Sequence, residues 1–137
     1  MPHLVILYTA NLDRDTDMSV LCRSLADTML AQRDETGKQV FPTGGVRVLA
    51  YPAAHSAVAD GKGDYGFVYL NLRIARGRSA ALQKQMGDVL TAAVGAHFAT
   101  LLAQQPLGIT FQIDEGSEVF DGKHSSLHPL FNKAATP

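Results

Sequence analysis

The chain has 137 residues, the usual size of one domain, and 46% of them are hydrophobic whereas 18% are charged. This composition allows a buried core and excludes a disordered tail. Twelve Lys and Arg against thirteen Asp and Glu leave a net charge of −1. Because no basic block could neutralise a run of phosphates, we expect no nucleic-acid partner. No apolar stretch reaches the roughly 18 residues of a spanning helix, so we expect no membrane partner.

The cysteine content gives no sign of an oxidising compartment. Cys22 is the single cysteine, so it forms neither an internal disulfide nor a multi-cysteine metal site. The first residues do not show the charged and then apolar segments of a secretory signal. We therefore expect a soluble protein of the cytoplasm, with Cys22 as an inert part of the core.

The first half of the chain predicts a strand, a helix and a second strand. Residues 2–9 are a short apolar run, typical of a strand that is buried on both faces. Apolar residues from Met18 to Met29 recur at helical spacing. A polar segment that ends in the turn-like run 42–45 separates this helix from the strand-like run 46–51.

The second half predicts the same order after a loop at residues 60–64. Residues 65–74 alternate, with aliphatic side chains on one face of the expected strand. Ser79 is a plausible N-cap for a helix from Ala80 to about Gln104, which Pro106 would end. Ile109 begins a further alternating run, which indicates a fourth strand, and beyond Gly116 we expect at most a turn or a short helix.

The two halves repeat one pattern at low similarity. We therefore predict an α+β fold of two βαβ units, about 2–58 and 64–116, in a single domain over residues 1–137 with a short C-terminal tail. Two right-handed crossovers side by side give a four-stranded mixed sheet with both helices on one face. The other face would be an apolar patch too large for a monomer, so symmetric self-association is expected.

Pro2 is the first candidate catalytic residue. Removal of the initiator Met would leave Pro2 with a free secondary amine at the start of a buried strand. Burial and nearby cations disfavour an ammonium ion and lower the pKa of such an amine below the ~8 of an ordinary α-amino group. A neutral amine can accept a proton from one atom and return it to another. The alternative is that Pro2 merely begins an edge strand.

Arginines form the second set of candidates. Arg73, Arg76 and Arg78 lie where a strand ends and a helix begins, and a cation there opposes the helix dipole unless an anion binds. Three solvated arginines are the alternative. Arg47 lies between Val46 and Val48 in a strand-like run and requires either an acidic side chain or an anionic substrate as its partner.

The histidines carry weaker signals. His124 and His128 have the spacing of two metal ligands on a helix, but no third ligand is evident, so we expect a surface pair and no metal site. His97 is expected to be a hydrogen-bonded, partly buried residue of the helical stripe. His3 either lines the same site as Pro2 or points away from it.

The order of these motifs resembles a known family. Pro2, Arg47 inside VRV and the helix-opening GRS at 77–79 resemble the tautomerase superfamily with its N-terminal proline. The segments MPH, FPTGGVR, DGKGDYGFVYLNLRIARGRS and HPLF are more specifically similar to the 5-carboxymethyl-2-hydroxymuconate isomerase family, over nearly the whole chain. The resemblance implies a homotrimer of double βαβ protomers without cofactor or metal, and an active site near or across a subunit boundary.

The resemblance also assigns roles to residues. Pro2 matches the catalytic proline, whose amine moves a proton in a dienol or enone without a covalent intermediate. Arg47 and Arg78 match the arginines that hold carboxylates of a di- or tricarboxylate substrate. The expected reaction is a double-bond shift by 1,3-proton transfer in a muconate-type acid, 5-carboxymethyl-2-hydroxymuconate above all, during breakdown of aromatic compounds by the homoprotocatechuate pathway.

Two alternatives remain open at this stage. The same fold could host a hydratase, dehalogenase or decarboxylase of a small unsaturated acid, although we find no clear water-activating group. The chain could also be a non-enzymatic trimeric binding module in which Pro2 has no chemical role.

Overall fold

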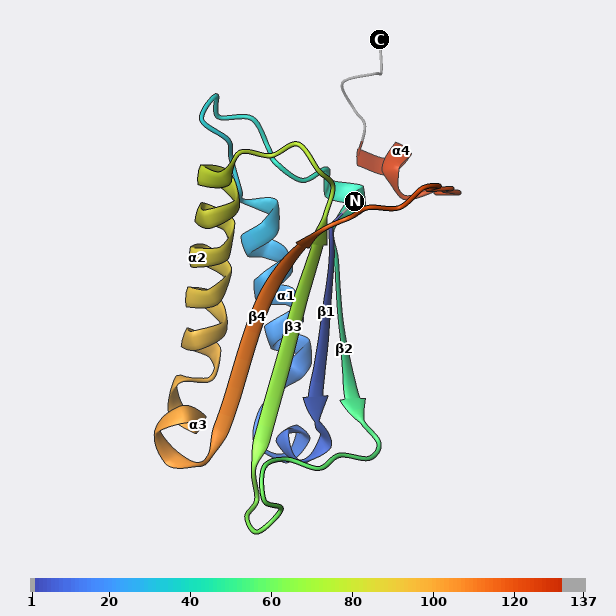
Figure 1. Ribbon diagram of the computed structural model, residues 1–137. Helices are drawn as coiled ribbons and strands as arrows, with labels where there is room; N and C mark the ends of the chain where they lie inside the picture. The colour runs from blue at the N-terminus through green and yellow to red at the C-terminus, as the bar shows by residue number, and fades with distance from the viewer. Residues whose placement is uncertain (1, 132–137) are drawn as a thin grey trace.

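The computed structural model describes residues 2–131 and places four strands in one mixed sheet (Figure 1). The strands are β1 (His3–Thr9), β2 (Arg47–Ala53), β3 (Gly66–Ile74) and β4 (Leu107–Glu115), in the order β2-β1-β3-β4. β1 is parallel to β2 and antiparallel to β3, and β3 is parallel to β4. The predicted pair of βαβ units in a four-stranded mixed sheet is confirmed.

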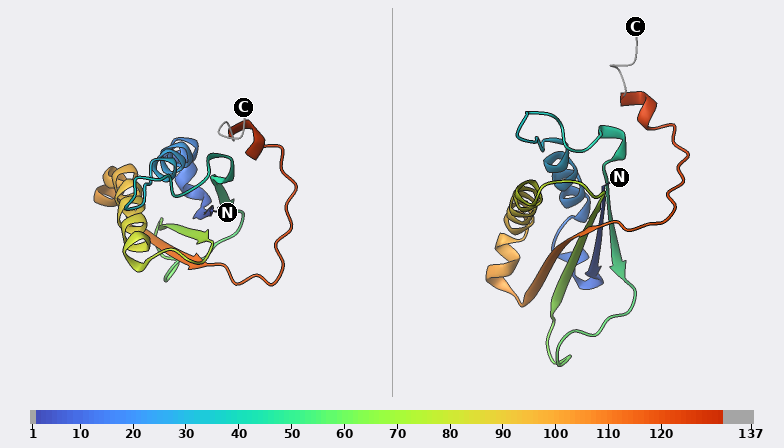
Figure 2. Two further views of the ribbon diagram at one scale, coloured as in Figure 1. Left: turned by 90° about the horizontal axis from the view of Figure 1, so that it is seen from above. Right: turned by 45° about the horizontal axis from the view of Figure 1, so that its top comes forward.

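Two long helices, α1 (Met18–Leu30) and α2 (Ala80–His97), cover the same face of the sheet (Figure 2). The side chain of Asp17 accepts hydrogen bonds from the backbone N–H groups of Ser19 and Val20 at the start of α1. Ser79 caps α2 as predicted, because its hydroxyl accepts from the N–H of Leu82. Two single-turn 3₁₀ helices, η1 (Ala10–Arg14) and η2 (Thr43–Gly45), flank the strands of the first half.

The core lies between the sheet and the two helices. One face of β1 and β3 and the inner sides of α1 and α2 supply fully buried side chains: Leu4, Ile6, Leu70, Leu72, Leu21, Leu25, Met86 and Leu90. The opposite face of the sheet carries apolar residues that this chain leaves open, among them Leu7 (48% exposed), Leu49, Tyr51 and Phe67. The prediction that residues 2–9 are buried on both faces is therefore wrong for the single chain, because one face of β1 has no covering layer.

The second predicted helix is shorter than expected. It was expected to continue to about Gln104, but α2 ends at His97, and a separate helix α3 (Ala99–Gln104) follows. Phe98 leaves helical geometry (ψ 8°) and becomes fully buried, with its ring edge-on to that of His97. Burial of this large ring turns the chain toward β4. His97 is partly buried and hydrogen-bonded, as predicted, since its Nε2 lies 2.8 Å from Oγ1 of Thr16.

The segment after β4 extends away from the sheet before it returns toward η2 as the short helix α4 (His128–Phe131) (Figures 1 and 2). We call residues 116–127 the C-terminal arm. Its Val119 and Phe120 are almost fully exposed. A Cβ atom on Gly44 would lie 2.9 Å from Cα of His128, so only glycine allows α4 to approach η2 so closely. The expected short helix in the tail is confirmed. Within residues 2–131, no helix is long and apolar enough to span a membrane.

Candidate active site

The candidate site lies at the end of the sheet where β1 begins. His3 pairs with Arg47 on β2 and, on its other side, with Arg73 on β3. Pro2 immediately precedes His3 and is buried. Because β1 has a neighbour on each side, the alternative that Pro2 begins an edge strand is wrong. The register places Arg47 beside His3, the residue that follows Pro2.

Arg47 is half-buried and carries a charge without an acidic partner. Val46 and Val48 pack against the core, which turns Arg47 to the opposite side of β2. Its Nη1 donates a hydrogen bond to the carbonyl oxygen of Gly45 at 3.2 Å. No acidic side chain forms an ion pair with Arg47 in the part of the chain that the structure describes. Within residues 2–131 the structure therefore does not contain the acidic partner that the sequence left open for Arg47.

Arg78 lies in the loop between β3 and α2, and its guanidinium also contacts only neutral groups there. Nη1 donates to the carbonyl of Ala75 at 3.0 Å and Nη2 to that of Val40 at 3.4 Å. The guanidinium carbon is 5.1 Å from the ring centroid of Phe41. Burial lowers the pKa of Arg78 from its ordinary value. The arginine thus lies beside the positive end of α2, an arrangement that favours an anion.

Arg78 and Arg47 belong to the same end of the sheet. The Val40–Phe41 segment, which Arg78 contacts, leads through η2 directly into Arg47. Figure 1 shows the loop before α2, η2 and the start of β1 at this end. Pro2, Arg47 and Arg78 therefore come from three separate segments, and these segments lie at the same end of the sheet.

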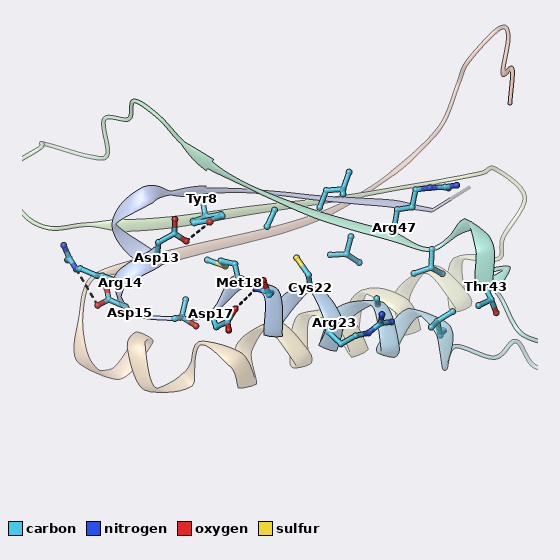
Figure 3. A pocket seen from close by; sticks show the side chains of 18 of the residues that line it. Tyr8, Asp13, Arg14, Asp15, Asp17, Met18, Cys22, Arg23, Thr43 and Arg47 are labelled. Atoms are coloured by element: carbon cyan, nitrogen blue, oxygen red, sulfur yellow. Dashed lines mark hydrogen bonds and ion pairs between the residues drawn. The ribbon is translucent and has the colours of Figure 1, made fainter. Parts of the chain in front are cut away.

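Two cavities adjoin Arg47. A cavity of about 300 Å³, which we call the edge cavity, lies at the end of the sheet where β1 begins. Arg47, His3 and Arg73 line one side of it and the C-terminal arm lines the other. A wide groove of about 1420 Å³ runs between α1 and β2, with Tyr8 and Asp13 at one end and Arg47 near the other (Figure 3). The smaller cavity is lined by His3, the residue after Pro2, but neither Pro2 nor Arg78 is among its lining residues.

The groove offers less chemistry than the edge cavity. Desolvation, together with a 2.7 Å hydrogen bond that the Tyr8 hydroxyl donates to Asp13, raises the pKa of Tyr8 to about 12. Burial raises the pKa of the Cys22 thiol, so little thiolate forms at neutral pH. Neither group suits proton transfer near pH 7.

Of the remaining predicted candidates, Arg76 is hydrogen-bonded, His124 lines the smaller cavity and His128 does not. Arg76 donates to the carbonyl of Gly116 at 2.9 Å and thereby anchors the C-terminal arm. His124 belongs to the arm, whereas His128 begins α4, so the two do not share a helix. In residues 2–131, no group of three His, Cys, Asp or Glu side chains is placed to hold a metal ion.

Sequence reasoning missed the acidic and basic groups of the C-terminal arm. Glu118 pairs with Arg73, and Asp121 pairs with Lys123, at the edge cavity. The arm has neither periodicity nor a motif, so no signal in the sequence placed it beside β1.

The fold defines the class of protein. A fused 4-OT that forms a symmetric trimer has a TM-score of 0.55 at 18% identity, covering 95% of this chain and 96% of that chain. The crystal structure of the FG41 malonate semialdehyde decarboxylase has a TM-score of 0.56 at 12% identity, with 98% of each chain covered. At such identities the fold alone is shared, and it is the tautomerase-like fold. Residues 2–131 match the 5-carboxymethyl-2-hydroxymuconate isomerase family, and the chain belongs to it.

More similar proteins carry the same name. The 5-carboxymethyl-2-hydroxymuconate Delta-isomerase of Escherichia coli is 30% identical over 131 residues, which are 96% of this chain and 99% of that protein. A crystal structure of a 5-carboxymethyl-2-hydroxymuconate delta-isomerase has a TM-score of 0.93 at 58% identity, covering 97% of this chain and 94% of that chain. The crystal structure of a 5-carboxymethyl-2-hydroxymuconate isomerase from Deinococcus radiodurans R1 has a TM-score of 0.85 at 35% identity, covering 96% of this chain and 95% of that chain. The protein is an isomerase of aromatic-compound catabolism, and the other reactions and the binding module are not favoured.

Proposed function

We propose that the protein shifts a double bond in 5-carboxymethyl-2-hydroxymuconate, or in a closely related carboxylated dienol, with Pro2 as the proton carrier. The observation that carries this proposal is the pair Arg47 and Arg78. Both lie at the end of the sheet where β1 begins, and neither has an acidic partner among the described residues. A substrate with several carboxylates supplies the anions that this end lacks.

The proposed mechanism needs one basic group and two anion-binding groups. After removal of Met1, the Pro2 amine takes a proton from the enol oxygen or from a carbon of the substrate and returns it to another carbon, so the double bond moves. Arg47 and Arg78 hold carboxylates. A carboxylate bound next to the carbonyl also draws electron density as the dienolate forms, so the same contacts bind and stabilise.

The direct test is the intact mass of untagged protein together with an isomerisation assay on 5-carboxymethyl-2-hydroxymuconate. The proposal expects a mass that lacks Met1 and a turnover that depends on a basic group titrating below about pH 8. Full activity of protein that keeps Met1 would contradict the proposal, because the nitrogen of Pro2 is then part of an amide and is not basic.

Arg47→Gln and Arg78→Gln are each expected to raise KM about 10- to 100-fold, because a charge-assisted hydrogen bond contributes about 1.5–3 kcal/mol. Each change also removes a cation near the base, which raises the pKa of the amine, so the acidic limb of the pH–rate profile moves to higher pH. Steady-state kinetics over pH measure both effects. Arg23→Gln is the matched control, since Arg23 forms an exposed pair with Asp27 on α1. An effect of the control as large as those of the two variants would refute the assignment.

We further propose a homotrimer in the cytoplasm. The open sheet face with Leu7, Leu49, Tyr51 and Phe67 supports self-association, because an apolar area of this kind is usually covered. The fold shared with a symmetric trimer supports the number of subunits, and a catabolic isomerase with a single cysteine suits the cytoplasm. Sedimentation equilibrium is expected to give three times the mass of the chain, and a monomer at micromolar concentration would contradict the trimer.

A further inference from the structure

Three neighbouring strands each place a basic side chain at the edge cavity. Arg47 on β2 and Arg73 on β3 flank His3 on β1 in register, and all three residues line the cavity. Adjacent strands are about 4.8 Å apart, so the two arginines, with β1 between them, are two strand spacings or about 10 Å apart along the sheet. Burial, followed by the charge of Arg47, lowers the pKa of His3, which leaves it a neutral hydrogen-bond donor at pH 7.

The C-terminal arm places two carboxylates at the same cavity as His3, Arg47 and Arg73. Glu118 accepts a hydrogen bond from Nη2 of Arg73 at 3.2 Å, and both side chains are about half exposed. Asp121 pairs with Lys123 of the arm itself at 2.7 Å. Asp114 lies opposite Arg73 in register on β4, but its Oδ2 accepts a hydrogen bond from the side chain of Asn71. Among the described residues, Arg73 therefore has one acidic partner, and this exposed ion pair is weak.

The geometry of the Arg73–Glu118 pair suits exchange with a ligand. Glu118 is a carboxylate on the C-terminal arm, outside the helices and strands, whereas Arg73 lies on β3 between β1 and β4. The adjoining cavity of about 300 Å³ has the size of a small organic acid. A substrate carboxylate that replaces Glu118 would meet the same guanidinium, with His3 and Arg47 beside it.

We propose that Arg73 is a specificity-determining residue that binds the third carboxylate of a tricarboxylate substrate, and that the Glu118 carboxylate holds Arg73 until the substrate displaces it. This inference rests on the proposed function for the identity of the substrate. Arg47 and Arg78 then serve the carboxylates common to di- and tricarboxylates, while Arg73 distinguishes the two classes.

The test compares two unreactive acids that differ by one carboxylate, propane-1,2,3-tricarboxylate and propane-1,3-dicarboxylate, by titration calorimetry on the Met1-free protein. The wild type is expected to bind the tricarboxylate about tenfold more tightly, the effect of one charge-assisted contact. Arg73→Gln is expected to weaken tricarboxylate binding by about the same factor and to change dicarboxylate binding less than about twofold. With the reacting tricarboxylate, KM rises and kcat stays nearly constant.

Glu118→Gln separates the proposal from a purely structural role of the pair. It removes the competing carboxylate and is expected to tighten tricarboxylate binding about two- to fivefold, because an exposed ion pair is weak. If the pair only held the arm in place, both variants would weaken binding. Arg23→Gln again serves as the control and should leave both affinities unchanged.

The outcomes distinguish this inference from the proposed function. Wild-type protein that prefers the tricarboxylate through Arg73 but does not isomerise the dienol would refute the function and keep the carboxylate site. Isomerisation with equal affinities for both acids, or with a preference that Arg73→Gln leaves intact, would overturn the inference and keep the function. A wild type that binds neither acid would also overturn it.

Discussion

Pro2→Ala is expected to lower kcat by about 100-fold or more, the scale of a positioned general acid–base group. The variant still loses its initiator Met and keeps an amine, but the amine is primary and no longer held by a ring. Pro2 is buried and directly precedes β1, which pairs with strands on both sides, so we expect the ring to hold its nitrogen in one orientation. Loss of that orientation acts on the proton transfer and much less on binding of the carboxylates.

The measurement is kcat and KM of Pro2→Ala across pH, with the intact mass of each sample as a check on Met1. KM is expected to stay within about threefold of the wild-type value, because Arg47 and Arg78 still bind the carboxylates. Unfolding in urea should be unchanged, which shows that the loss is chemical. Activity of Pro2→Ala within about tenfold of the wild type would refute the role of Pro2.

Phe41→Ala is expected to lower the free energy of unfolding by about 3–5 kcal/mol, the usual cost of truncating a fully buried Phe. Phe41 has no exposed surface, and its ring lies under the guanidinium of Arg78. The change therefore leaves a cavity and also removes the surface on which Arg78 rests. Binding of substrate should weaken together with stability.

Urea unfolding at one fixed protein concentration measures the first effect, because self-association makes stability depend on concentration. Phe41→Leu is the matched control, since it keeps most of the volume and should cost less than about half as much. If Phe41→Leu weakened substrate binding as strongly as Arg78→Gln does, the aromatic ring itself, rather than the filled volume, would be what positions Arg78. Equal stability of Phe41→Ala and wild type would contradict the burial of this residue.

Local signals explain most of what the sequence predicted. Strand and helix periodicity, together with the Ser79 cap, was enough to define four strands and two long helices because each signal lies within a few neighbouring residues. The end of α2 at His97 depends on burial of Phe98, and although Gly95 lies two residues before that end, no glycine or proline follows it at residues 98–104. Such a break is decided by tertiary packing, which a one-dimensional pattern does not contain.

The candidate site divides in the same way. Pro2, Arg47 and Arg78 could be selected from their positions at element ends and from a family resemblance. The approach of Arg73 to Glu118 joins residues 45 positions apart, and it follows from the path of an arm without regular structure. The sequence did not predict the contacts that position Arg78 either. Val40 supplies a backbone carbonyl and Phe41 supplies a ring beneath the guanidinium, and neither contact follows from a local pattern.

β1, the first of the four strands in chain order, occupies an interior position of the sheet. β1 pairs with β2 of its own half and with β3 of the other half, and His3 meets Arg73 only after 70 further residues have been synthesised. One side of β1 therefore has no hydrogen-bond partner until the chain has emerged beyond β3. We expect the first half of the nascent chain to remain incompletely folded until then. A chain cut in the loop 54–65 should likewise fold only when its two pieces are brought together.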